Sequence, residues 1–181
     1  MAEENNSVAE GTPPQQPRVK VLNQYIRDLS FENVAVQKDR MPEGQTNFEV
    51  QVALDARKVG DNQYEVINKL KVNATVGEDK IFILEMDYAG RFSIENVPNE
   101  QLHAFLMIEC PRMVFPYLRR VVGDVTRDGG YPPLNLDNID FLALYRNEMA
   151  RMAQAQAEAK DAPISSGVKT SKGGQWVAFS S

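Results

Sequence analysis

Residues 64–88 read YEVINKLKVNATVGEDKIFILEMDY, and this stretch decides the predicted fold. Apolar side chains occupy every second position over most of residues 64–76 and again over residues 82–88, which is the period of a half-buried β-strand. The turn at residues 77–79 is too short for the crossover that parallel strands need, so the two strands must pair antiparallel. The stretch therefore predicts the centre of an antiparallel sheet.

Two further strands are predicted on the N-terminal side. Residues 48–54 alternate between apolar and polar and are followed by a turn at residues 60–62. Residues 19–32 also alternate, although Leu22 and Ile26 violate the pattern. The predicted core set is Val19, Val21, Tyr25, Leu29 and Phe31, and the predicted solvent set is Lys20, Gln24, Asp28, Ser30 and Glu32. We expect the four strands to form a meander-like antiparallel sheet.

Two helices are predicted after the sheet. Residues 99–128 follow helical spacing and run into Gly129-Gly130, which should end the helix. Pro111 and Pro116 are expected to break or kink it, because proline lacks an N–H and its ring crowds the preceding turn. Residues 131–136 resemble an extended connector, and a second helix follows from Phe141. The fold class is therefore α+β, a four-stranded antiparallel sheet followed by two helices.

The ends of the chain differ in composition from its middle. The chain has 181 residues and a mass of 20.3 kDa, enough for one domain with a hydrophobic core. Polar residues, glycine and proline dominate both ends, which predicts a disordered N-terminal arm at residues 1–17 and a disordered C-terminal tail at residues 158–181. The folded domain is expected at residues 18–157. Trp176 and Phe179 are unusually apolar for such a tail.

Composition excludes several classes of protein. The formal net charge is −5, so nucleic acid is not an expected partner and a basic protein is a better one. No apolar run approaches the roughly 20 residues of a membrane span, which argues against direct membrane insertion. The N-terminus lacks the basic start and apolar stretch of a secretory signal, so we expect a cytoplasmic protein.

The residues suited to catalysis are few. The chain has one histidine and one cysteine, no phosphate-binding glycine loop and no metal-ligand spacing. His103 and Cys110 lie two helical turns apart, roughly 10 Å, which is too far for a nucleophile–base pair. We therefore predict no enzyme, no catalytic residues, no metal and no cofactor. The remaining alternative is a carboxylate-based enzyme or a carrier of a small ligand between sheet and helices.

Two surfaces suggest binding instead. Ile81 and Ile83 share a predicted strand face with Glu85 and Asp87, which is either a solvated acidic face or a docking surface for a protein. Large apolar residues also stand outside regular elements, where connectors usually run over the surface. They are Met41, Tyr131, Leu134 and Leu136, and they either cover the sheet as core or line a groove for extended apolar segments.

Six segments, weak singly but ordered and spaced consistently, give the chain a specific resemblance. They are Asp28-Leu-Ser-Phe-Glu32, Gln37-Lys-Asp39, Tyr64-Glu-Val66, Cys110-Pro111, Phe115-Pro-Tyr117 and Tyr131-Pro-Pro-Leu-Asn-Leu136, the last leading to Phe141. Over residues 18–150 the chain resembles the SecB family of protein-export chaperones.

The resemblance implies an ATP-independent chaperone that keeps unfolded precursor proteins translocation-competent and delivers them to the SecA motor. It also implies a homotetramer, a dimer of dimers with the first helix between the dimers. The SecA-binding positions of the family match Asp28, Glu32, Ile83 and Glu85. The family's client groove matches Met41, Tyr131, Leu134, Leu136, Phe141, Leu144 and Tyr145.

Two positions depart from the family pattern. Many members have tryptophan after the Gln-Lys-Asp segment, where this chain has Arg40. The family's extreme C-terminus makes a second SecA contact, and residues 158–181 show no matching segment.

Overall fold

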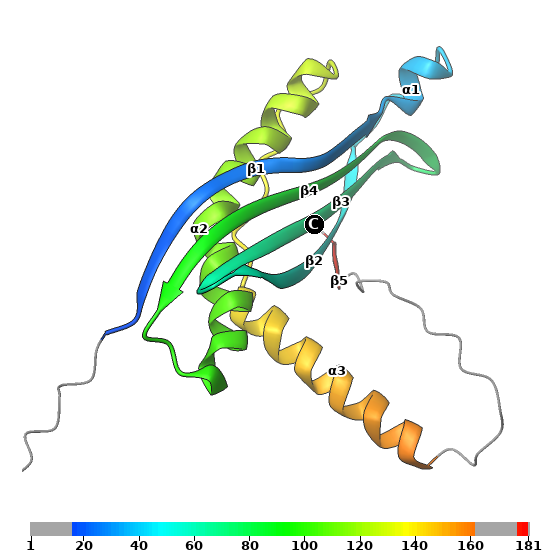
Figure 1. Ribbon diagram of the computed structural model, residues 1–181. Helices are drawn as coiled ribbons and strands as arrows, with labels where there is room; N and C mark the ends of the chain where they lie inside the picture. The colour runs from blue at the N-terminus through cyan, green and yellow to red at the C-terminus, as the bar shows by residue number, and fades with distance from the viewer. Residues whose placement is uncertain (1–15, 162–176, 181) are drawn as a thin grey trace, which may run out of the picture.

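The computed structural model describes residues 16–161 and 177–180 and shows one antiparallel sheet with helices on one face (Figure 1). The elements in chain order are β1 (Arg18–Glu32), α1 (Val34–Gln37), β2 (Asn47–Gly60), β3 (Gln63–Val76), β4 (Asp79–Glu95), α2 (Asn99–Asp128), α3 (Phe141–Asp161) and β5 (Val177–Ser180). Four long strands followed by two long helices confirm the predicted α+β class. Most of the predicted N-terminal arm and C-terminal tail lies outside the described residues, but residues 158–161 continue α3 and residues 177–180 form β5.

The strand order is β1-β4-β3-β2-β5, which corrects the predicted meander at one position. Strands β2, β3 and β4 follow one another through short turns, as expected. β1 pairs with β4 and not with β2, its neighbour in sequence. Residues 33–46, which include the short helix α1, join β1 to β2. This connection is long enough to cross the end of the sheet, so β1 and β2 need not be neighbours.

β1 contains two register shifts against β4, at Leu22 and at Arg27. Each shift inserts one residue, so the two faces of β1 exchange between them. The register places Gln24 and Ile26 on the side of the helices and Tyr25 on the opposite, outer face. The predicted sides of Tyr25 and Gln24 were therefore wrong, and the misfit at Leu22 and Ile26 was the sequence signal of the shifts.

A further register shift corrects the prediction for Ile81. β3 and β4 pair at Thr75–Lys80 and next at Ala74–Phe82, so Ile81 has no partner directly opposite. Its side chain is only 4% exposed and belongs to the core. Ile81 is therefore absent from the acidic face, whereas Ile83 stays on the outer face opposite Glu32.

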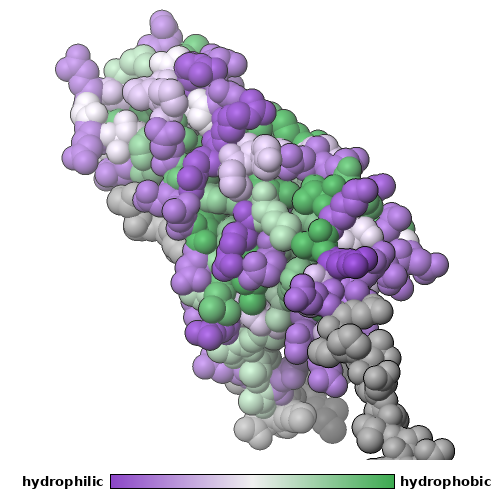
Figure 2. Space-filling view, turned by 90° about the vertical axis from the view of Figure 1, so that its left-hand side faces the viewer, coloured by the Kyte–Doolittle hydropathy of each residue, from purple (hydrophilic) through white to green (hydrophobic). Residues whose placement is uncertain are grey.

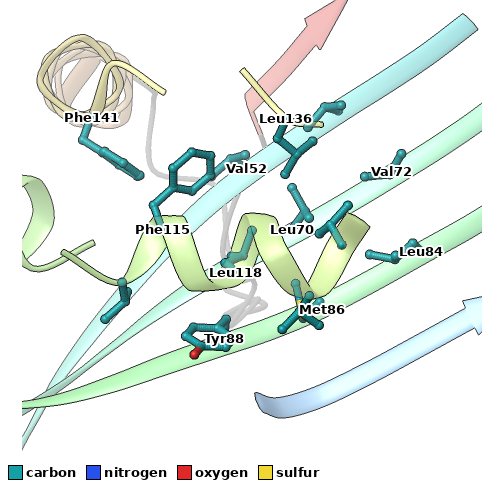
Figure 3. Close-up of a cluster of buried hydrophobic side chains, with 14 of the residues drawn as sticks. Val52, Leu70, Val72, Leu84, Met86, Tyr88, Phe115, Leu118, Leu136 and Phe141 are labelled. Atoms are coloured by element: carbon teal, nitrogen blue, oxygen red, sulfur yellow. The ribbon is translucent and has the colours of Figure 1, made fainter. Parts of the chain in front are cut away.

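The core lies between the sheet and α2, and Figure 3 shows its centre. The labelled side chains are Val52, Leu70, Val72, Leu84, Met86 and Tyr88 from the sheet, Phe115 and Leu118 from α2, Leu136 from the connector and Phe141 from α3. Phe115 and Phe141 stack edge to face with ring centroids 5.7 Å apart, which ties α3 to α2. The connector and the start of α3 are thus fixed against the sheet.

Neither proline ends α2, which continues for 30 residues and corrects the expected break. Pro111 is buried, and its carbonyl accepts a hydrogen bond from Nδ2 of Asn68 on β3 at 3.4 Å. Each proline costs one backbone hydrogen bond. Because α2 buries ten residues along its length, packing against the sheet outweighs that cost.

Candidate binding surfaces

The outer face of the sheet brings together all four residues predicted to bind SecA. The register sets Asp28 opposite Asp87, Ser30 opposite Glu85, and Glu32 opposite Ile83. Directly opposite residues of an antiparallel pair share a face and stand about 5 Å apart. Asp28, Glu32, Ile83 and Glu85 therefore form one patch across β1 and β4, which we call the acidic patch.

Acidic and basic side chains mix on and beside the acidic patch. Burial raises the pKa of Asp87, the charges of Lys69 and Arg27 lower it, and the smaller effect of Asp28 opposite raises it again. Glu85 forms an ion pair with Lys71, with Nζ and Oε1 2.5 Å apart. With Glu32 included, four carboxylates stand here against three cationic side chains, so a basic partner is favoured. Ile83, a half-buried apolar residue, lies among them.

A second cluster on the outer face, further along the strands, was missed by the sequence analysis. The Glu65 carboxylate on β3 is 2% exposed and accepts hydrogen bonds from Tyr25 and, at 2.6 Å, from Nε of Arg57. Arg27 and Arg91 approach it to 3.5 Å and 3.9 Å. The cluster joins β1, β2, β3 and β4. Alternation along β1 predicts Tyr25 on the opposite face from Glu65. Only the register shift at Leu22 brings the two side chains together, so the sequence pattern did not reveal the cluster.

The charged form of Glu65 is favoured despite its burial. Burial opposes ionisation, but hydrogen bonds from Tyr25 and Arg57 and the charges of Arg57 and Arg27 outweigh it, so the pKa of Glu65 lies below its usual value. The cluster therefore stabilises the sheet most when Glu65 is ionised.

We expect Glu65→Gln to lower the free energy of unfolding by about 2 kcal/mol at pH 7, because hydrogen bonds to a buried charge are lost. A pKa that is lower in the folded state gives stability that is present above the unfolded pKa and lost as the pH falls through the folded pKa. The difference between wild type and variant should therefore shrink from pH 7 to pH 3. Urea denaturation at both values measures it, with the exposed Glu95→Gln as control; a constant difference would contradict this account.

A pocket of about 360 Å³ lies on the helix side of the sheet, between β2 and the connector. Phe48, Val50 and Val52 of β2 form one wall, and residues 134–140 form the other. Leu134 and Leu136, two of the predicted groove residues, are part of the lining. The three β2 residues were predicted only as a core face, since alternation does not reveal whether a strand is fully covered.

The other predicted groove residues lie outside this pocket. Phe141 and Leu144 are buried in the described chain. Tyr131 packs on Phe82, with ring centroids 5.1 Å apart, and its hydroxyl donates to Oδ1 of Asn33 at 2.5 Å. Tyr145 lies against His103 of α2. Tyr131 and Tyr145 are half-buried. The packing of Tyr131 on the core supports, for this residue, the alternative that it covers the sheet.

Met41 remains the most exposed of the predicted groove residues, at 62%. It lies in the loop after α1. Its neighbour Arg40, at the position where the family often has tryptophan, pairs with Asp79 at the start of β4 over 2.9 Å. This ion pair fastens the loop to β4. Met41 is not among the residues that line the pocket.

The cysteine and histidine do not form a catalytic pair. Nδ1 of His103 and the hydroxyl of Tyr145 are 3.3 Å apart. Cys110 is fully buried, and burial together with the charge of Glu109 raises the pKa of its thiol to about 12. The thiol stays protonated near neutral pH and is a poor nucleophile.

The described residues provide neither a cluster of metal ligands nor a helix suited to a membrane. Within residues 16–161 and 177–180, histidine, cysteine and carboxylate side chains do not gather in groups of three or more that could bind a metal ion. Over the same residues, none of the helices combines the length and the apolar character needed to cross a bilayer.

Known proteins share both the sequence and the fold. The chain is 55% identical to protein-export protein SecB of Roseobacter denitrificans, over 90% of this chain and all of that protein. It is 58% identical to protein-export protein SecB of a Ruegeria species, over 86% of this chain and 96% of that protein. Among solved structures, a Mycobacterium tuberculosis SecB-like chaperone, determined with a peptide from the HigA1 antitoxin, has a similar fold, with a TM-score of 0.57 at 15% identity. The match covers 67% of this chain and 90% of that one.

The sequence model of one family, described as preprotein translocase subunit SecB, matches residues 12–152. That match spans the four long strands and both long helices up to the middle of α3. Together with the identity to full-length relatives, it shows that this chain belongs to the SecB family of protein-export chaperones.

Proposed function

We propose that the protein is an ATP-independent holdase that binds unfolded precursor proteins, keeps them translocation-competent and delivers them to SecA. One observation carries the proposal: the pocket and the acidic patch lie on opposite faces of the same sheet. The β2 residues of the pocket point to the helix side, and the acidic patch occupies the outer side. A client and a motor protein can therefore bind at the same time without competing for surface.

Membership of the SecB family decides between the classes left open by the sequence. The protein is a non-enzymatic chaperone, which rules out the carboxylate-based enzyme. As a SecB homologue it acts in the cytoplasm, as the sequence predicted.

The pocket suits weak and unselective binding of apolar segments. Its volume is near the lower end for ligand pockets, so one copy accommodates a few side chains. Apolar area leaving water stabilises the complex by about 25 cal/mol per Å² and discriminates poorly between side chains. Several copies in one assembly raise the effective concentration of each pocket for a long client, which turns weak contacts into firm holding.

Two exposed surfaces support the proposed homotetramer. β1 is an edge strand, and four of its apolar residues are about 40% exposed: Val21, Leu22, Ile26 and Leu29. Figure 2, which looks at the left-hand side of Figure 1, shows hydrophobic residues gathered between hydrophilic ones. An uncovered edge of this kind promotes pairing with another chain, so a second copy is the natural cover. On α2, Met113 and Tyr117 are also exposed and are available for contact between two dimers.

Light scattering after size exclusion tests assembly and holding together. The protein alone should have a mass of about four times 20.3 kDa. Addition of a chemically unfolded precursor should increase that mass by one precursor, whereas the same precursor after folding should leave it unchanged. A monomer would contradict the multivalent mechanism, and equal binding of both precursor forms would contradict the holdase.

A further inference from the structure

The C-terminal strand β5 lies on the free edge of β2 (Figure 1). It pairs antiparallel with Glu49–Val52, and the register sets Val177 opposite Val52 and Phe179 opposite Val50. Val50 and Val52 are also two of the three β2 residues that line the pocket. The chain therefore places its own residues 177–180 along the strand that forms one wall of the proposed client site.

An open strand edge next to an apolar pocket is a site for peptide binding. Unpaired N–H and C=O groups of the edge form main-chain hydrogen bonds with any extended segment, and neighbouring pockets accept alternate side chains. The sequence of β5 has this form, with Val177 and Phe179 separated by Ala178. An unfolded client offers many segments of the same kind.

The pairing of β5 is suited to exchange. β5 contributes four residues and pairs with β2 over four positions. Each backbone hydrogen bond adds only about 1 kcal/mol net in water. β5 belongs to the same chain as β2, so its return to the edge is intramolecular and does not depend on protein concentration. β5 should therefore lower the apparent affinity of the edge for clients by a moderate factor without excluding them.

We infer that the edge of β2 is a strand-addition site for extended apolar client segments, and that β5 is a built-in competitor that occupies this edge when no client is bound. The inference rests on the proposed holdase function and specifies how part of a client binds. It also assigns a role to Val177 and Phe179, two apolar residues near the end of the sequence.

The test uses the full chain with Val177→Gly and Phe179→Gly, which weakens strand formation and removes both apolar side chains. If β5 occupies the edge for most of the time, the apparent Kd for an unfolded precursor should fall about fivefold in the variant. The matched control is Ile164→Gly with Val168→Gly, the same kind of change between α3 and β5 in the sequence, which should bind as wild type does. Equal affinity of wild type and β5 variant, or an equal gain in the control, would overturn the inference.

Hydrogen exchange of residues 49–52 supplies the second readout. The amides among them that point toward β5, every second one, should exchange faster in the β5 variant than in wild type and slow again when the precursor is added. Failure of the precursor to restore protection would overturn strand addition. Failure of the proposed function has a different signature, because neither wild type nor variant would then bind the unfolded precursor.

Discussion

Replacing Asp28 and Glu85 by lysine should weaken SecA binding by about a hundredfold at low salt and leave binding of unfolded precursor unchanged. Both residues belong to the acidic patch, and each reversal replaces an attraction to a basic partner with a repulsion. At roughly 1 to 1.5 kcal/mol for each reversed charge, two reversals correspond to that factor. In the variant, Lys71 would face a second lysine instead of Glu85, which adds to the repulsion.

Salt dependence and a matched variant separate this effect from misfolding. Calorimetric titration with SecA at 50 and 300 mM salt should show a smaller difference at the higher salt, because the screening length falls below 10 Å. Glu43→Lys with Glu100→Lys makes the same change of net charge at exposed residues away from the acidic patch. An equal loss in this control would assign the effect to net charge, and a parallel loss of precursor binding would indicate a damaged fold.

Leu134→Glu should weaken binding of unfolded precursor by tenfold or more, with SecA binding retained. The side chain lines the pocket, so a carboxylate there must lose water whenever an apolar segment enters. The backbone of Leu134 should stay in place, because its N–H donates to Oγ1 of Thr126 at 2.9 Å whatever the side chain. In a tetramer each copy carries the change, so the effect is repeated at every pocket.

The matched control for Leu134→Glu is Leu142→Glu, on the exposed side of α3 and outside the pocket lining. Competition for a fluorescent unfolded precursor measures both variants, and circular dichroism checks that both remain folded. Similar losses in the two variants would mean that the pocket is not the principal client site.

The sequence predicted the separate strands well because alternation with period two is a local property. Residues 64–76 and 81–88 lie in β3 and β4 with the predicted faces, apart from Ile81. The place of β1 was mispredicted because no local pattern says which edge a strand joins after a connection as long as residues 33–46. The face of Tyr25 was mispredicted because one inserted residue moves the side chains that follow it, up to the next register shift, to the other face of the sheet.

The two candidate surfaces were predictable to different degrees. Asp28, Glu32, Ile83 and Glu85 come together as the resemblance implied, since regular strands carry each residue to a definite side. Of the predicted groove residues, only Leu134 and Leu136 line the pocket, while Phe141 and Leu144 are buried. A connector shows no periodicity, so whether its apolar residues cover the core or line a gap depends on how neighbouring elements pack.

By itself, the sequence determined the number and type of the main elements, the acidic character of one sheet face and membership of the SecB family, because these follow from patterns along the chain. Tertiary structure alone decided that β1 joins β4, that Glu65 gathers three arginines and a tyrosine, and that β5 lies along β2. Each of these depends on residues that are distant in the chain, and their pairing results from packing and hydrogen bonding that only the whole fold can satisfy.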